Sequence, residues 1–84
     1  MPGVHVRVLV FARLRELLGF GARELEVDDG TTLDDVWVRL SRDAPALGGL
    51  RASTRFARNG TLVDGAALVR EGDEVALLPP VGGG

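Results

Sequence analysis

The sequence contains no cysteine and no lysine, and it has a single histidine, His5. Without cysteine the chain has no disulfide, no thiolate metal site and no thiol nucleophile. Without lysine it has no side-chain amine that forms a Schiff base or accepts an acyl group. A lone histidine does not make a metal site, so we expect no bound metal. These absences exclude catalysis by a cysteine or lysine side chain of this chain, as well as structural disulfides.

A surplus of positive charge and a long apolar run are also missing. Ten basic residues, all arginine, stand against twelve acidic ones, so the charge predicts no nucleic-acid partner. The apolar stretches are only a few residues long, and no signal-peptide pattern is present. We therefore expect no membrane association and a cytoplasmic location. At 84 residues folding buries about 60% of the surface, which leaves little room for a deep catalytic pocket.

The first third of the chain predicts strand, short helix and strand. Residues 4–12 alternate, with four valines on one face, while the other face turns apolar at Leu9 and Phe11. The segment RLRELLGFG has leucines at helical spacing, which predicts one or two helical turns ending at Gly19. RELEV alternates again and predicts a second strand.

The segment TTLDDVWVRLSRDAP predicts the main helix. Thr32 is placed to cap its start, and Asp35 three residues later completes a capping box. Pro45 ends the helical pattern. Four apolar residues at helical spacing predict one buried stripe: Leu33, Val36, Trp37 and Leu40.

The remaining segments predict a loop and then strands. ALGGLRAST is expected to be a loop, and RFARNGTLV a strand that turns at Asn59-Gly60 and returns through Leu62. REGDEVALLPP predicts a turn and a closing strand with Ala76 and Leu78 on one face.

One substantial helix over a mixed sheet predicts the α+β class and a β-grasp, or ubiquitin-like, roll. In that arrangement the first and last strands form a central parallel pair. A ferredoxin-like fold is the alternative, but it needs a second full helix where residues 45–55 are short and rich in glycine. We expect one β-grasp domain over residues 1–81 and a flexible glycine tail over residues 82–84.

A single main helix covers one face of the sheet and leaves the other face open. Leu9 and Phe11 project to that face, and Leu62 and Leu78 are expected near them. A contiguous exposed apolar cluster marks a partner site. The alternative is that the short helix, or the loop around Leu47, folds over these side chains.

The sequence ends PPVGGG, in which two prolines that restrict the backbone precede three glycines that leave it flexible. Pro79 and Pro80 carry no amide donor and end strand pairing. Residues 81–84 then span roughly 13 Å when extended. Glycines fit a narrow tunnel because they have no Cβ. The tail could therefore carry the terminal carboxylate of Gly84 into the active site of another enzyme, which would activate it. The alternative is a frayed end with no role, or a truncation scar.

Two segments carry a family resemblance. VRVLVFARLRELLG near the start and NGTLVDGAALVREGDEVALLPPVGGG at the end resemble the small subunits of molybdopterin synthase, which are ubiquitin-like sulfur carriers. The resemblance implies that a ubiquitin-activating-type adenylyltransferase uses ATP to adenylate Gly84, and that a persulfide donor converts it to a thiocarboxylate. It implies no bound cofactor, because ATP serves only the activating enzyme.

The resemblance also implies a division of labour. The tail inserts into the large synthase subunit, which binds cyclic pyranopterin monophosphate and supplies the catalytic side chains, so this chain alone is not an enzyme. A heterotetramer is expected. Gly83 and Gly84 form the reacting end, and the implied partner contacts are Phe11, Leu62, Leu78, Pro79, Pro80, Val81 and Gly82.

Three other functions remain open from the residues. The chain suits a sulfur carrier for thiamine or tRNA thiolation, because such carriers share the terminal diglycine. It also suits a protein modifier, whose adenylated glycine would form an isopeptide bond with a lysine of a target. A β-grasp interaction module with an inert tail is the third.

Overall fold

The computed structural model describes residues 3–80. Their elements follow the predicted order, with one addition between the main helix and the third strand. In chain order they are β1 (Val4–Val10), α1 (Ala12–Leu18), β2 (Ala22–Val27), α2 (Leu33–Asp43), the 3-10 helix η1 (Pro45–Ser53), β3 (Arg55–Arg58), β4 (Thr61–Val63) and β5 (Glu74–Leu78).

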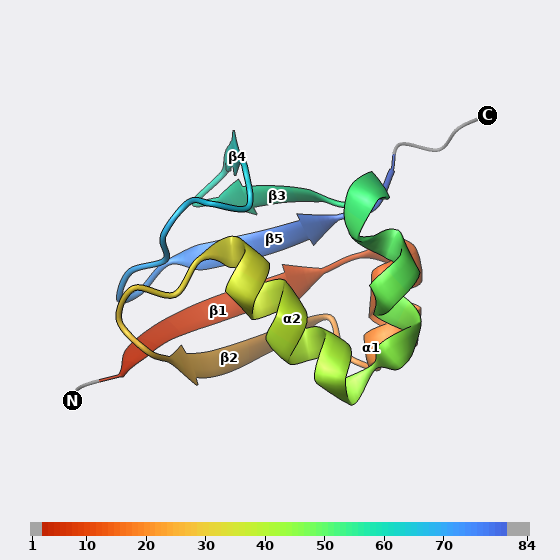
Figure 1. Ribbon diagram of the computed structural model, residues 1–84, viewed down its shortest axis with the longest axis horizontal. Coiled ribbons are helices and arrows are strands. Elements are labelled where there is room, and N and C mark those ends of the chain that lie inside the picture. Colours follow the sequence, from red (N-terminus) through yellow and green to blue (C-terminus); the bar gives the residue numbers. More distant parts are fainter. Residues whose placement is uncertain (1–2, 81–84) are drawn as a thin grey trace.

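Over residues 3–80 the strands form one five-stranded sheet in the order β2-β1-β5-β3-β4. The first and last strands pair in parallel at its centre, with Val8 opposite Val75, and the other pairs are antiparallel. Figure 1 shows α2 crossing one face of this sheet. The predicted β-grasp roll is confirmed, and the ferredoxin-like alternative is wrong because only a 3-10 helix follows α2.

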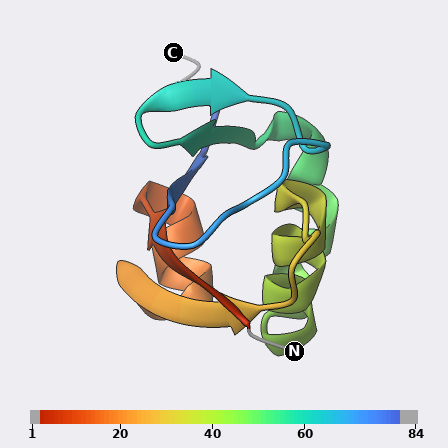
Figure 2. The ribbon, with the colours of Figure 1, turned by 90° about the vertical axis from the view of Figure 1, so that its left-hand side faces the viewer.

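The core lies between the sheet and α2. The four valines of β1 are all buried, as the alternation predicts, and so are Leu25 and Val27 of β2. The predicted stripe of α2 faces them, and Trp37 is only 5% exposed. Figure 2 shows the sheet curving around α2 from β4 at the top to β2 at the bottom. Burial of these aliphatic side chains supplies most of the driving force for folding.

The start of α2 has the predicted capping box. The Thr32 hydroxyl accepts a hydrogen bond from the amide of Asp35 at 3.1 Å, and the Asp35 carboxylate accepts one from the amide of Thr32 at 3.0 Å. The hydrogen bond from the Thr32 amide, with a smaller contribution from the Thr32 hydroxyl, lowers the pKa of the Asp35 carboxyl below its usual value. The two bonds of the capping box also satisfy amides that the first helical turn leaves without partners.

The loop predicted after α2 is wrong, because residues 45–53 form η1. A 3-10 helix has three residues per turn, so residues three apart lie on the same side. Leu47 is accordingly buried completely, and Leu50 packs against the same core. A search for a period of 3.6 does not detect this pattern, and Gly48 and Gly49 give the segment the composition of a loop.

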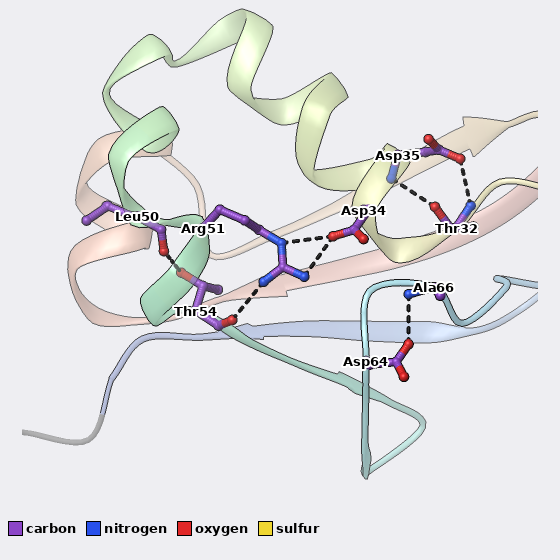
Figure 3. A network of polar contacts seen from close by, with 8 residues as sticks. All are labelled: Thr32, Asp34, Asp35, Leu50, Arg51, Thr54, Asp64 and Ala66. Carbon is purple, nitrogen blue, oxygen red and sulfur yellow. Dashed lines mark hydrogen bonds and ion pairs between the residues drawn. The ribbon is translucent and has the colours of Figure 1, made fainter.

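Arg51 ties η1 to its neighbours (Figure 3). Its guanidinium lies 2.7 Å from the Asp34 carboxylate at the start of α2, and it donates to the carbonyl of Thr54 at 3.2 Å. The same guanidinium stacks 4.2 Å above the ring of Phe56 in β3. One side chain therefore connects η1, α2 and the sheet.

The short helix α1 begins and ends at left-handed residues. Ala12 has φ +48°, which turns the chain sharply away from β1, and Gly19 has φ +82°. The Gly19 amide donates to the carbonyl of Arg15 at 2.8 Å, so the predicted stop at this glycine is confirmed. Within residues 3–80 no helix combines the length and hydrophobicity that a membrane crossing requires.

Candidate functional site

A row of apolar side chains crosses the open face of the sheet. Strand register places Leu9 of β1 opposite Ala76 of β5, Ala76 opposite Ala57 of β3, and Ala57 opposite Leu62 of β4. Leu9 and Ala76 alternate with buried neighbours, so they point away from α2, and the strand register aligns Ala57 with them although it is itself buried, at 8% exposed. The row has leucines at its ends and small alanines at its centre.

The ends of the apolar row, and Phe11 near it, remain accessible. Leu62 is 57% exposed and Phe11, which directly follows β1, is 44% exposed. Leu9, Ala76 and Leu78 are half-buried. The alternative in which α1 or η1 covers these residues is therefore wrong: the two helices turn Leu14 and Leu47 into the core instead.

The other end of the open face is charged. Arg7 lies between Glu24 of β2 and Glu74 of β5, and His5 lies opposite Glu26. These positions are nearer the start of β1, whereas Phe11 and Leu78 lie at its end. The open face thus has an apolar half beside the end of β5 and a charged half away from it.

The exit of the chain from the sheet lies at the apolar end. β5 stops at Leu78, opposite Arg55, and is followed by the half-buried Pro79 and the exposed Pro80. Two shallow hollows of about 500 and 470 Å³ border both prolines. Their other lining residues come from α1, η1 and the start of β3: Ala12, Arg13, Leu14, Leu50, Ala52, Ser53, Thr54 and Arg55.

The structure brings together most of the described residues predicted for the site. Because Val10 and Leu77 are paired in register, Phe11 and Leu78 follow at the same end, next to the two prolines. Leu62 lies farther away on β4 and is connected to them through the apolar row. The predicted residues Val81, Gly82, Gly83 and Gly84 lie outside the described residues, and so does the boundary between the domain and its tail.

The sequence patterns did not predict two parts of this surface, which are Ala57 in β3 and the 3-10 helix η1. Ala57 follows the buried Phe56 in β3, so the strand alternation was the signal that could have found it. Leu50 and Ser53 were missed because η1 was expected to be a loop. The described site residues are aliphatic, aromatic or proline side chains, and they offer contact area rather than acid–base chemistry. No group of three potential metal ligands occurs in residues 3–80.

Comparison with known proteins agrees with this arrangement. Residues 8–84 match the ThiS family. The molybdopterin synthase sulfur carrier subunit of Haemophilus influenzae is 41% identical over 81 residues, covering 94% of this chain and 99% of the relative. The sulfur carrier subunit of Chlamydomonas reinhardtii is 36% identical over 84 residues, covering 96% of this chain and 100% of the relative.

The fold is also found among solved structures. The crystal structure of small archaeal modifier protein 1 from Haloferax volcanii has a TM-score of 0.83 at 31% identity, covering 94% of this chain and 100% of that chain. The resemblance to molybdopterin synthase small subunits, read from the two ends of the sequence, is confirmed. Since the family match covers nearly the whole sequence, this chain belongs to the ThiS family.

Proposed function

We propose that this protein is the sulfur carrier of a molybdopterin synthase and works in the biosynthesis of the molybdenum cofactor. The observation that carries the proposal is the near-full-length identity of 36% and 41% to two molybdopterin synthase sulfur carrier subunits. The exit of β5 beside an exposed apolar surface supports it, because a carrier needs a docking face next to its reacting end.

The proposed chemistry takes place on the main chain of Gly84. A carboxylate oxygen attacks the α-phosphorus of ATP in the activating enzyme, which releases pyrophosphate and leaves an acyl adenylate. The terminal sulfur of a persulfide then attacks the carbonyl carbon, and AMP leaves. A second thiol then attacks the donor's sulfur in the resulting acyl disulfide, so that the two thiols become joined in a disulfide and the thiocarboxylate leaves. Each thiocarboxylate gives one sulfur to cyclic pyranopterin monophosphate and returns to a carboxylate, so two successive transfers make the dithiolene.

The rest of the chain serves this terminus in the proposal. Pro79 and Pro80 end strand pairing, because neither has an amide to donate. The glycines that follow enter a narrow site in the large subunit, because they have no Cβ. Phe11, Leu62 and Leu78 contact that subunit, which supplies the catalytic side chains and forms a heterotetramer with the carrier.

Mass spectrometry of the intact protein tests the proposal. The protein is incubated with ATP, the adenylyltransferase and a persulfide donor of its host, and then added to the large subunit with the pyranopterin. We expect exchange of one oxygen for one sulfur at the terminus before the large subunit is added, and reversal of that exchange afterwards.

The matched control lacks only Gly84. It should fold and bind the large subunit as the full chain does, yet accept no sulfur, because its terminal carboxyl is one residue too short for the activating site. A truncated chain that still supports conversion of the pyranopterin contradicts the proposal.

Protein modification is a second candidate, favoured by the similarity to small archaeal modifier protein 1. In that role the adenylated glycine is transferred to a lysine amine of a target. Denaturing gels of the native host, probed for this chain, then show conjugates of higher mass that disappear when Gly84 is deleted. Free chain without conjugates contradicts this role.

A further inference from the structure

Charge is distributed unevenly along the strand direction. Figure 1 shows α1, η1 and the end of β5 at one end of the sheet, opposite the start of β1. We call the first end the exit end, and its exposed acidic residues are Glu16, Asp43 and Asp64. Its exposed arginines are more numerous: Arg13, Arg15, Arg23, Arg42 and Arg55. The basic residues at the opposite end are Arg39, Arg58 and Arg70. Its acidic residues are more numerous: Glu26, Asp28, Asp29, Asp35, Glu71, Asp73 and Glu74.

Two of these arginines stand beside the base of the tail. Arg13 borders the hollow on the α1 side of Pro79 and Pro80, and Arg55 borders the hollow on the β3 side. Both are exposed. Among residues 3–80, neither makes an ion pair or a side-chain hydrogen bond.

Internal structure does not account for the position of these two charges. Arg51, by contrast, is held by Asp34, and Arg58 donates to the carbonyl of Leu68. Exposed guanidinium groups that lack such contacts keep their full capacity for an external carboxylate. The chain therefore presents two available cations on either side of its exit.

We infer that Arg13 and Arg55 dock on an acidic rim around the site that receives the tail. The inference rests on the proposed function, and it names the chemistry of the partner surface: carboxylates encircling the mouth of a tail-binding tunnel in the large synthase subunit. The apolar row supplies contact area, and the two arginines orient the approach so that the tail meets the mouth first.

The charge polarity of the whole molecule favours this orientation. The charged half of the open face holds four carboxylates, Glu24, Glu26, Glu71 and Glu74, against Arg7 and His5. Its net negative charge is repelled by the same acidic rim. A dipolar carrier turns its basic end toward an acidic surface during encounter, which raises the association rate more than the lifetime of the complex. The effect weakens as salt screens the charges.

Stopped-flow association with the large subunit, measured at several salt concentrations between about 20 and 300 mM, tests the inference. Arg55→Glu is compared with Arg70→Glu, which changes the net charge equally at the opposite end. At low salt we expect Arg55→Glu to lower the association rate about 3- to 10-fold, with little change in dissociation. Arg70→Glu should leave the association rate within about twofold.

Further variants separate charge from misfolding. Arg55→Gln should give a smaller loss than Arg55→Glu, and Arg13→Glu a loss similar to that of Arg55→Glu. Thermal melts confirm that each variant is folded. Association that does not depend on salt, or equal slowing by Arg55→Glu and Arg70→Glu, overturns the inference while leaving the proposed function intact. A wild-type chain that does not bind the large subunit contradicts the proposed function itself.

Discussion

At the scale of single residues, His5 lies where carboxylates from two other segments meet β1. Its Nδ1 is 3.1 Å from the Glu71 carboxylate, which also accepts a hydrogen bond from the His5 amide at 2.9 Å, and its Nε2 is 3.9 Å from Glu26. The hydrogen bond and the charge of Glu71 raise the pKa of His5 above 6.5, with smaller contributions from Glu26 and Glu24. Hydrogen bonds from His5 lower the pKa of Glu71.

The titration of His5 follows from this contact. Because its pKa is raised in the folded protein, the contribution of His5 to stability is fully present below pH 6.5 as long as Glu71 stays ionised. That contribution is lost as the pH rises through the folded value. The contribution of Glu71 is lost at the acidic side, as the pH falls through its lowered pKa. NMR should show His5 titrating above 6.5.

Glu71→Gln provides the control for this titration. Removing the carboxylate charge should move the His5 midpoint down toward the ordinary value, because the charge of Glu71 no longer raises the pKa and a neutral amide oxygen accepts a weaker hydrogen bond from the imidazole. The spectrum needs no assignment, since His5 is the single histidine. An unchanged midpoint in the variant would show that Glu71 does not hold the imidazole.

At the scale of elements, η1 is the segment whose composition and structure disagree most. Its alanines, glycines and arginine resemble a surface loop, yet Leu47 is fully buried in the common core. The same element borders the chain exit through Leu50 and Ser53. Its packing therefore both completes the core and shapes the surface beside Pro79.

Leu47→Ala tests the packing of η1. Truncating a fully buried leucine leaves a cavity, so we expect a loss of about 3 kcal/mol in the free energy of unfolding. Leu68→Ala, at a residue that is 47% exposed, should cost less than about 1 kcal/mol. Urea denaturation followed by the fluorescence of the single tryptophan, Trp37, measures both. Equal small losses would mean that η1 does not pack as described.

At the scale of the whole molecule, the two faces of the sheet have different tasks. α2 seals one face, while the other keeps an apolar half that is continuous with the chain exit. Exposed apolar residues also occur on the sealed side, where Val38 of α2 is 50% exposed. An exposed residue alone is thus no evidence of an interface, and the distinction lies in contiguity.

One aspartate introduced on the open face, compared with one introduced on α2, tests which side of the protein binds the large subunit. Phe11→Asp should weaken binding to the large subunit by about 2 kcal/mol or more, roughly 30-fold in Kd, because an aromatic contact is lost and a charge is desolvated. Val38→Asp introduces the same charge on α2 and should leave the Kd unchanged. Calorimetric titration measures both, and a larger effect of Val38→Asp would place the interface on the helical side.

The sequence alone predicts those features that arise from local patterns. Alternation predicts that the valines of β1 are buried, and helical spacing predicts the buried stripe of α2. Single residues predict where helices begin and end, as at the Thr32 cap of α2 and at Gly19 after α1. The order of these elements is enough to predict the β-grasp roll, because one helix must cover one face of the sheet. The two ends of the chain are also enough for the family resemblance.

Only the tertiary structure decides what depends on distant segments lying together. The line from Leu9 through Ala57 to Leu62 exists because strands far apart in the chain pair in one register, and a shift of one residue would bury it. The burial of Leu47 follows from packing between elements. So does the position of the exposed Arg13 and Arg55 on either side of Pro79. Local pattern determines which face of each element is apolar, whereas pairing determines which of those faces meet.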